Sequence, residues 1–341
     1  MKIALVAPGF GQTGGPEVAV QNLAQAFSAK NIDFSLFAPG DWETPYPHIP
    51  TLSKSIWNME NFSEQGEWER RNLIFASQTT VLRYQNDFDI IHLHAQRNAY
   101  AVAAGSRLPI VVTLHSQIEN GTFDLLKTAG VHTVGLTQNQ VGNFPVDAII
   151  KNGLPLNEIT PSFEAGEYLL AVGRLNMQKG IHQAIKIAKL AKKKLIIIGR
   201  VGISDDRQGY FTEHIKPFID NEQVIHIESV PRDKMFEYFR HASFLLFPIT
   251  IPESNPLVVI EALAAGTPLL GTTVAPLLEM VPNSEKVALF SDNLEKLAEA
   301  ARHPERFDRA ACRHYAEKNF DSGRMADEYI VLYEKILNLQ K

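Results

Sequence analysis

Residues 168–198 read YLLAVGRLNMQKGIHQAIKIAKLAKKKLIII and contain a complete strand–helix–strand unit. Tyr168–Val172 and Leu195–Ile198 are short apolar runs, and the second shows no alternation of polar and apolar residues. A strand without alternation is buried on both faces, as in parallel sheets that carry helices on each side. Between the two runs, Ile181–Lys192 is amphipathic and long enough for a helix. The stretch therefore predicts a βαβ unit in a parallel sheet.

The same alternation continues in both directions along the chain. Further strands are expected at Lys2–Ala7, Asp33–Phe37, Ile90–His94, Ile110–Leu114, His132–Leu136, Ala148–Lys151, Val224–Ile227, Phe244–Phe247 and Pro268–Gly271. Further helices are expected at Pro16–Lys30, Gly66–Arg83, Asp233–His241 and Asn255–Ala265, and residues 304–341 are mostly helical in character. This order predicts an α/β protein whose parallel sheets are covered by helices on both sides.

Length and one irregular segment predict two domains. The chain has 341 residues, more than twice the ~150 that one domain usually takes. Segment 152–166 is rich in turn residues and separates the strands and helices into two series. We therefore expect a domain boundary near residue 152, with a cleft between the two domains.

Composition and charge limit the classes of function. Hydrophobic residues make up 45% of the chain and charged residues 21%, which is typical of a folded globular protein. The net charge of −5 argues against non-specific binding of nucleic acid. Cys312 is the single cysteine, which excludes an internal disulfide and a cysteine-based zinc site and fits a reducing compartment. No run approaches the ~18 apolar residues of a membrane span, and no signal peptide is recognisable, so we expect a cytoplasmic protein.

A glycine-rich loop follows the first expected strand. Gly9, Gly11 and Gly14 match the spacing G-x-G-x-x-G, but the acidic residue that a dinucleotide site needs at the end of the second strand is missing. Gly14 and Gly15 precede Pro16 at the start of a helix, an arrangement that suits an anion at the helix end. The alternative is a tight turn without a ligand.

Two cationic residues follow the strand Tyr168–Val172. Arg174 and Lys179 lie in a glycine-flanked loop at the carboxyl end of that strand, where open α/β sheets bind ligands. A guanidinium and an ammonium group at such a turn suit a diphosphate.

The segment PESNPLVVIEALAAGTP, residues 252–268, holds two spaced glutamates. Glu253 lies in a loop after an expected strand, with Asn255 as a plausible helix N-cap and Pro256 at the first helical position. Glu261 lies inside the apolar run Leu257–Ala265, where a buried carboxylate must be hydrogen-bonded or costs several kcal/mol. The two carboxylates are spaced to hold separate hydroxyl groups of one extended ligand.

Taken in order, these motifs resemble those of family 4 glycosyltransferases, which are retaining, nucleotide-sugar-dependent enzymes with the GT-B fold. The resemblance also includes DIIHLH at 89–94 and VVTLH at 111–115, and covers residues 3 to about 275. It implies two Rossmann-like domains that face each other across a cleft. Residues 1–152 would form the acceptor-side domain, residues 153–320 the donor domain, and 321–341 a C-terminal helix that returns to the first domain.

The resemblance also implies roles for individual residues. Arg174 and Lys179 would contact the diphosphate of the donor. Glu261 would hold the ribose hydroxyls, Glu253 would face the sugar ring, and His115 would approach the donor sugar near its anomeric carbon. His92 and His94 alternate on one strand, and we interpret them as structural or acceptor-lining. The remaining expected substrate-binding positions are Gly14, Gly15, Asn255, Pro256 and Leu257.

The implied reaction is hexosyl transfer with retention by front-face attack. No cofactor and no divalent metal are expected, because the two cations already face the diphosphate. Asp87 and Asp89 form an Asp-x-Asp pair, but they precede a strand, so we interpret them as a solvated turn. A UDP-sugar is the first expectation for the donor, with GDP- and ADP-sugars open. The acceptor is a glycan, a lipid-linked sugar or a small metabolite, and peripheral membrane contact and oligomeric state stay open.

The sequence departs from the family pattern at two positions, and three alternatives stay open. Ser254-Asn255-Pro256 stands where the family usually has glycine and an aromatic residue, and Asn152-Gly153-Leu154-Pro155 lacks a frequent acid. A GT-B sugar-nucleotide epimerase would isomerise the donor without an acceptor. An NAD-dependent dehydrogenase would change nicotinamide absorbance. A non-catalytic nucleotide-sugar binder would tolerate the loss of Glu253 or His115.

Overall fold

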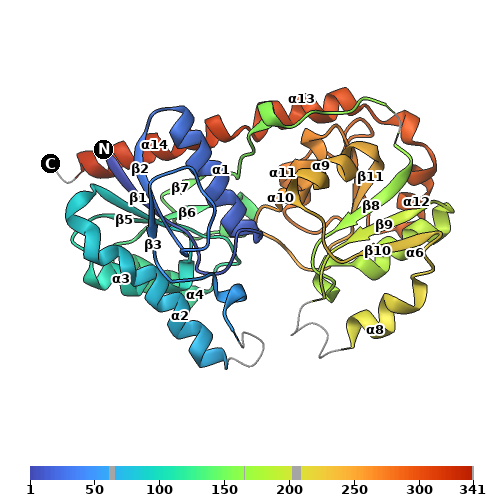
Figure 1. The fold of residues 1–341 in the computed structure, drawn as a ribbon. Coiled ribbons are helices and arrows are strands. Elements are labelled where there is room, and N and C mark those ends of the chain that lie inside the picture. The colour runs from blue at the N-terminus through green and yellow to red at the C-terminus, as the bar shows by residue number, and fades with distance from the viewer. Residues whose placement is uncertain (61–65, 165, 202–208, 340–341) are drawn as a thin grey trace. The chain divides into compact units, whose positions relative to one another are not determined.

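The computed structural model describes residues 1–60, 66–164, 166–201 and 209–339 (Figure 1). The chain divides into two compact units. Unit 1 comprises Met1–Pro155 and Phe320–Lys341, and unit 2 comprises Leu156–Asn319. The sequence placed the corresponding bounds at residues 152 and 320.

Unit 1 is built on a parallel sheet. Its seven strands follow the order β3-β2-β1-β4-β5-β6-β7, and every neighbouring pair is parallel. The strands are β1 (Lys2–Val6), β2 (Asp33–Ala38), β3 (His48–Pro50), β4 (Ile90–Leu93), β5 (Ile110–Thr113), β6 (His132–Gly135) and β7 (Ala148–Ile149). All were expected except β3. That strand has three residues and ends in a proline, which leaves no hydrophobic pattern to detect.

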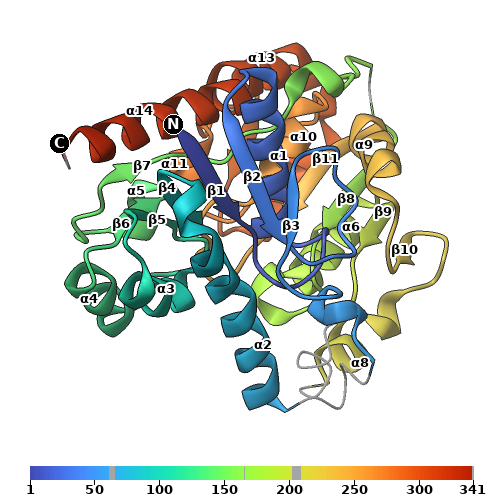
Figure 2. The ribbon, with the colours of Figure 1, turned by 60° about the vertical axis from the view of Figure 1, so that its left-hand side comes forward.

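Helices cover both faces of this sheet (Figures 1 and 2). One core cluster joins β1 and β2 to α1 and α14, and a second joins β4 and β5 to α3 and α4. The helices are α1 (Gly15–Ala29), α2 (Glu67–Thr79), α3 (Ala99–Gly105), α4 (Asn120–Thr128), α5 (Gln138–Val141) and α14 (Ser322–Asn338). The helix expected over Gly66–Arg83 ends at Thr79 and continues as a 3-10 helix, Thr80–Asp87.

The two chain segments at the unit boundary are paired with each other. The backbone N–H of Leu154 donates to the carbonyl of Phe320 at 2.8 Å, and the N–H of Ser322 donates to the carbonyl of Leu154 at 2.9 Å. A Cβ on Gly153 would lie 2.7 Å from the Cα of Ser322, so the close approach needs glycine there. This pairing fixes the start of α14 on unit 1.

Unit 2 repeats the architecture with six parallel strands in the order β10-β9-β8-β11-β12-β13. The strands are β8 (Tyr168–Val172), β9 (Leu195–Ile198), β10 (Val224–Ile227), β11 (Ala242–Phe247), β12 (Leu269–Gly271) and β13 (Ala288–Phe290). The helices are α6 (Ile181–Ala191), α8 (Tyr210–His214), α9 (Arg232–His241), α10 (Leu257–Ala264), α11 (Leu277–Met280), α12 (Leu294–Arg302) and α13 (Arg309–Asn319). The expected α/β class, with two parallel-sheet domains, is confirmed. Within the described ranges, no helix is long and apolar enough to cross a membrane.

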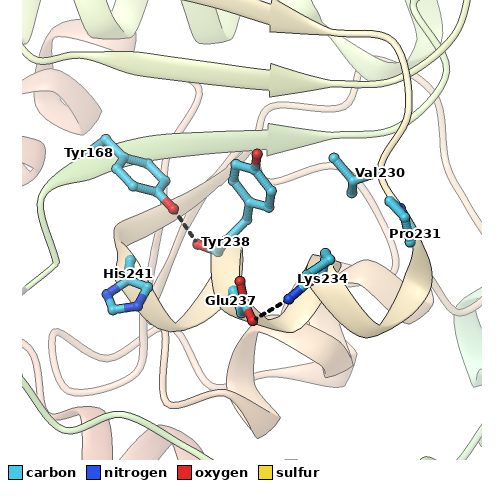
Figure 3. A pocket seen from close by; sticks show the side chains of 7 residues that line it. All are labelled: Tyr168, Val230, Pro231, Lys234, Glu237, Tyr238 and His241. Atoms are coloured by element: carbon cyan, nitrogen blue, oxygen red, sulfur yellow. Dashed lines mark hydrogen bonds and ion pairs between the residues drawn. The ribbon is translucent and has the colours of Figure 1, made fainter.

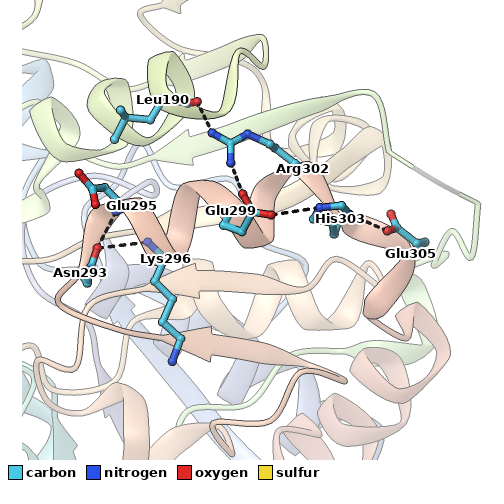
Figure 4. Close-up of polar contacts among 8 residues, drawn as sticks. All are labelled: Leu190, Asn293, Glu295, Lys296, Glu299, Arg302, His303 and Glu305. Carbon is cyan, nitrogen blue, oxygen red and sulfur yellow. Dashed lines mark hydrogen bonds and ion pairs between the residues drawn. The ribbon is translucent and has the colours of Figure 1, made fainter.

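A network of hydrogen bonds and ion pairs between exposed side chains links α12 to α6 (Figure 4). Arg302 donates to the carbonyl of Leu190 at 2.7 Å and pairs with Glu299. His303 lies between Glu299, at 3.3 Å, and Glu305, at 2.9 Å. These side chains are exposed, so each pair contributes about 0–1 kcal/mol, and the packed core between α6, α12 and the sheet supplies most of the stability.

Arg309 on α13 is a buried arginine with a structural role. Its guanidinium donates to the carbonyls of Ser162 at 2.8 Å, Ala242 at 2.7 Å and Arg240 at 2.6 Å. These three carbonyls belong to the segment before β8, the start of β11 and the end of α9, so one side chain joins three parts of unit 2.

Replacing Arg309 by methionine is expected to lower the free energy of unfolding by about 2–4 kcal/mol, because it leaves buried carbonyls without a hydrogen-bond donor. Urea unfolding followed by circular dichroism measures the effect. Arg302→Met makes the same replacement at an exposed arginine and is expected to change the free energy of unfolding by about 0.5 kcal/mol or less. Equal effects of the two substitutions would contradict this role.

Candidate functional site

The loop after β8 places both cationic residues of unit 2. Arg174 is exposed at its start. The Asn176 side chain accepts a hydrogen bond from the backbone N–H of Lys179 at 3.1 Å and so caps a short 3-10 turn. Gly180 follows with φ +65°, and a Cβ there would come within 1.8 Å of the Pro248 carbonyl oxygen. The loops after β8 and β11 therefore lie in direct contact, and only glycine fits at position 180.

This contact brings Lys179 and Glu253 together. The Lys179 Nζ lies 2.6 Å from Glu253 Oε1, and the exposed fractions of the two side chains are 19% and 23%. The Lys179 ammonium also lies 5.5 Å from the centre of the Phe247 ring. An ammonium has three N–H donors, so Lys179 can hold Glu253 and still donate to an anionic ligand.

Glu261 is the more deeply buried of the two motif glutamates. It lies in α10 with a side chain that is 12% exposed, and its Oε1 is 3.3 Å from Nη1 of Arg232. Burial raises the pKa of Glu261, whereas the charge and hydrogen bond of Arg232 act in the opposite direction. Arg232 is the counter-ion of this carboxylate. Arg232 was not among the residues expected from the sequence, because a single arginine at the start of a helix carries no signal of its own.

The start of α10 differs from the expectation. Asn255 was expected to cap the helix with Pro256 at its first position, but Pro256 occupies the N-cap and α10 begins at Leu257. Pro256 has an extended ψ of 116°, and its own side chain makes no capping hydrogen bond. The Asn255 side chain is buried and its amide donates to the sulfur of Met280 at 3.3 Å. The Asn255 side chain is thus packed against Met280, and the helix starts two residues after it.

In unit 1, α1 begins beside the glycine loop. Gly14 is the N-cap, with no side-chain cap, and Gly15 is the first helical residue. The buried carboxyl group of Glu17 lies close to Gly14, since a Cβ there would be 2.0 Å from Glu17 Oε2. Burial raises the pKa of Glu17 to about 7, while a hydrogen bond from its own backbone N–H acts against this. The helix end that was expected to receive an anion therefore already holds a carboxyl group of the protein.

Three histidines lie at the carboxyl ends of neighbouring strands. His115 follows β5, and its Nε2 is 2.8 Å from Nδ1 of His94, which follows β4. Within β4, the ring of His92 has Thr113 Oγ1 at 2.8 Å and the hydroxyl of Tyr333 at 2.6 Å. Burial lowers the pKa of His92 to about 3 and that of His115 to about 4. Both rings are therefore neutral near pH 7.

Acidic residues elsewhere do not form a metal site among the described residues. There, no group of three or more histidine, cysteine, aspartate or glutamate side chains is arranged to hold an ion. Asp89 accepts a hydrogen bond from the backbone N–H of Lys2 at 2.7 Å, at the amino end of β4. Asp89 thus has a local structural partner, and the Asp-x-Asp pair lies away from the carboxyl ends of the strands.

A cavity of about 360 Å³ in unit 2 lies along α9 (Figure 3). The Tyr168 hydroxyl donates to the carbonyl of Tyr238 at 3.0 Å across it, and Lys234 pairs with Glu237 on the helix at 3.2 Å. None of the expected site residues is among those that line it. These are Tyr168, Val230, Pro231, Lys234, Glu237, Tyr238 and His241. Because Tyr168 begins β8, the cavity reaches the amino end of that strand, opposite the Lys179 loop.

Comparison with known proteins matches each of the two units to a glycosyltransferase family model. Residues 13–139 match the family model for Glycosyltransferase Family 4, and residues 156–318 match the model for Glycosyl transferases group 1. D-inositol 3-phosphate glycosyltransferase of Arthrobacter sp. (strain FB24) is 24% identical, over 85% of this chain and 83% of that protein.

Solved structures share the fold over nearly the whole chain. Anabaena Alr3699/HepE in complex with UDP and glucose superposes with a TM-score of 0.76 at 16% identity, over 98% of this chain and 100% of that one. Sucrose-phosphate synthase from Thermosynechococcus elongatus gives a TM-score of 0.76 at 16% identity, over 99% and 100%. At such identities the likeness establishes the fold alone.

Proposed function

The chain belongs to glycosyltransferase family 4 and has its GT-B fold, and on that premise we propose that it is a retaining hexosyltransferase that uses a nucleotide diphosphate sugar. The observation that carries the proposal is the pairing of each motif glutamate with a cation, Glu253 with Lys179 and Glu261 with Arg232. The donor class is supported by the UDP and glucose bound to the similar Anabaena protein. No finding favours an epimerase or a non-catalytic binder.

In this proposal the diphosphate binds at the loop after β8. Arg174 is exposed and, within the described ranges, has no hydrogen bond or ion pair of its side chain, so its guanidinium is available for a phosphate. Lys179 provides the second cation. The N-terminus of α10, at Leu257, adds backbone N–H groups of the kind that bind phosphate. Asn255 and Pro256 contribute by shaping the loop that leads into this helix end.

The two glutamates hold the rest of the donor. Glu261 accepts hydrogen bonds from the ribose hydroxyls, because a carboxylate has four lone pairs and Arg232 occupies one side of it. Glu253 faces the sugar ring while it remains paired with Lys179. From unit 1, His115 contacts the donor sugar near its anomeric carbon, and Gly14 and Gly15 form part of the substrate surface.

The reaction that fits these groups is front-face substitution. The bond between the anomeric carbon and the diphosphate oxygen breaks, and the acceptor oxygen bonds to the same face of that carbon. The acceptor proton passes to the leaving phosphate oxygen. Arg174 and Lys179 stabilise the negative charge that develops on the leaving group, so we propose that the reaction needs no divalent metal.

Product analysis tests this proposal. The enzyme is incubated with UDP-, GDP- and ADP-sugars and a panel of glycan, lipid-linked and small-metabolite acceptors in the presence of EDTA, and the anomeric proton is followed by NMR. Transfer with the anomeric configuration of the donor is expected. An isomerised donor without an acceptor would favour an epimerase, and an inverted product would contradict retention.

Arg232→Gln is expected to weaken donor binding more at pH 5.5 than at pH 8. Arg232 opposes the rise in the pKa of Glu261 that burial causes, so its loss raises that pKa further and more of Glu261 is protonated as the pH falls. A protonated carboxyl accepts hydroxyl hydrogen bonds less well than a carboxylate. Isothermal titration with the donor nucleotide at both pH values measures the effect, and Lys234→Gln on the same helix is the control. An equal loss at both pH values would contradict the counter-ion role.

A further inference from the structure

His94 and His115 are held beside each other by the strands that precede them. β4 and β5 are parallel neighbours, with Leu93 opposite Val112, so the residues just beyond their ends are adjacent. The backbone N–H of His94 donates to the Val6 carbonyl at 3.1 Å, which ties this end of β4 to β1. The planes of the two imidazole rings are inclined by 28° with centres 5.1 Å apart, and His94 Nδ1 lies 2.8 Å from His115 Nε2.

This contact requires one protonated and one unprotonated nitrogen. A hydrogen bond between two neutral imidazoles uses the N–H of one ring and the lone pair of the other. Burial and the neighbouring imidazoles hold the pKa of His94 well below its usual value, and burial lowers that of His115. Each ring therefore carries a single proton near pH 7, and the protons can be arranged in two ways.

The surroundings of His94 distinguish the two arrangements. His94 is 4% exposed, and its Nε2 is buried without a hydrogen-bond partner among the residues that the structure describes. If His94 accepted at Nδ1, its only proton would lie on Nε2 as an unpaired buried donor, which is rare in folded proteins. If His94 donates from Nδ1, Nε2 bears only a lone pair. The second arrangement is therefore favoured.

His92 does not change this choice. Its ring centre is 4.3 Å from that of His94, but both of its nitrogens already have partners, Thr113 and Tyr333. Tyr329 in turn shares a 2.7 Å hydrogen bond with the Thr113 hydroxyl. The two tyrosines belong to α14, so the C-terminal helix holds His92 in place beside His94.

We propose that His94 is a positioning residue that donates from Nδ1 to His115 Nε2 and so fixes His115 as the Nδ1–H tautomer. The other ring nitrogen of His115, Nδ1, is then a hydrogen-bond donor, suited to a hydroxyl or ring oxygen of the sugar rather than to removal of a proton. The inference rests on the proposed function, in which His115 contacts the donor sugar. The inference adds that His115 is protonated at Nδ1 and that the hydrogen bond from His94 keeps the proton on that nitrogen.

Tautomer-resolved NMR of the ¹⁵N-histidine-labelled protein tests the proposal without any substrate. Long-range ¹H–¹⁵N correlation distinguishes a protonated from an unprotonated ring nitrogen, and the signals that disappear in His115→Gln identify His115. The expected result is a neutral His115 protonated at Nδ1. An Nε2-protonated His115 in the wild-type protein would overturn the proposal, whatever the outcome of nucleotide binding.

Three substitutions of His94 supply a second readout. The side-chain amide of His94→Asn places an N–H near the position of Nδ1, whereas His94→Gln and His94→Leu do not. His94→Asn is expected to keep most of kcat, and the other two are expected to lose about 10²-fold with little change in the Kd of the nucleoside diphosphate. Equal losses of kcat in all three folded variants would overturn the proposal.

Discussion

Lys179→Met is expected to lower kcat/KM by about 10³-fold, the upper range for loss of one group that stabilises a developing negative charge. The substitution removes a cation from the diphosphate loop and leaves Glu253, 2.6 Å away, without its partner beside an anionic leaving group. Steady-state kinetics with saturating acceptor measure the loss. Lys234→Met on α9 removes an exposed lysine and is expected to leave the rate unchanged.

The pairing of Lys179 with Glu253 adds a sharper test. The double variant Lys179→Met, Glu253→Gln is expected to bind the nucleoside diphosphate more tightly than Lys179→Met alone, because it lacks the unpaired negative charge. A Lys179→Met enzyme within about threefold of the wild-type rate would contradict the role given to this lysine, since loss of a charge-stabilising donor usually costs far more.

Glu261→Met is expected to raise the KM for the donor by about 10²-fold with a smaller change in kcat. Hydrogen bonds to a charged group contribute about 1.5–3 kcal/mol each, and contacts to the ribose are the same in the ground state and the transition state. Parallel kinetics with the donor and its 2′-deoxy analogue measure the effect directly. Wild-type enzyme is expected to prefer the ribonucleotide, and the variant to lose that preference.

The control for Glu261→Met is Glu237→Met, which removes an exposed glutamate of α9. The variant at 237 is expected to retain both the KM and the preference for ribose. An undiminished preference for ribose in Glu261→Met would mean that another group of the protein recognises the ribose of the donor.

Strands buried on both faces were the most predictable part of this protein. β8 and β9 match the expected bounds, because short continuous apolar runs are typical of strands buried on both faces. β3 and β13 have three residues each and are set by pairing with a neighbouring strand, which no local pattern reveals. α2 ends at Thr79, before the expected end at Arg83, and no glycine or proline marks that end in the sequence.

The sequence indicates candidate site residues but not their partners in the fold. Spacing makes Lys179, Glu253 and Glu261 candidates, because their types and positions are unusual for a loop and an apolar helix. The ion pairs depend on which loops meet in the fold, so Arg232 was missed as the partner of Glu261. Glu17 was missed for the same reason, since its burial beside Gly14 follows from packing around α1.

Asn255 shows where a local rule gave the wrong result. Asparagine before proline is a common helix start, yet its amide contacts the sulfur of Met280 and Pro256 takes the N-cap. A buried loop that must pack against α11 overrides the capping preference of one residue, and only the tertiary structure contains that information.

Isothermal titration of the protein with UDP, GDP and ADP tests the central claim most directly, because it asks whether unit 2 binds a nucleoside diphosphate through Arg174 and Lys179. One of the three is expected to bind with a stoichiometry of one, and binding is expected to be lost in Arg174→Ala and Lys179→Met but kept in Lys234→Met. Failure of all three to bind the wild-type protein, or equal binding by every variant, would contradict the account.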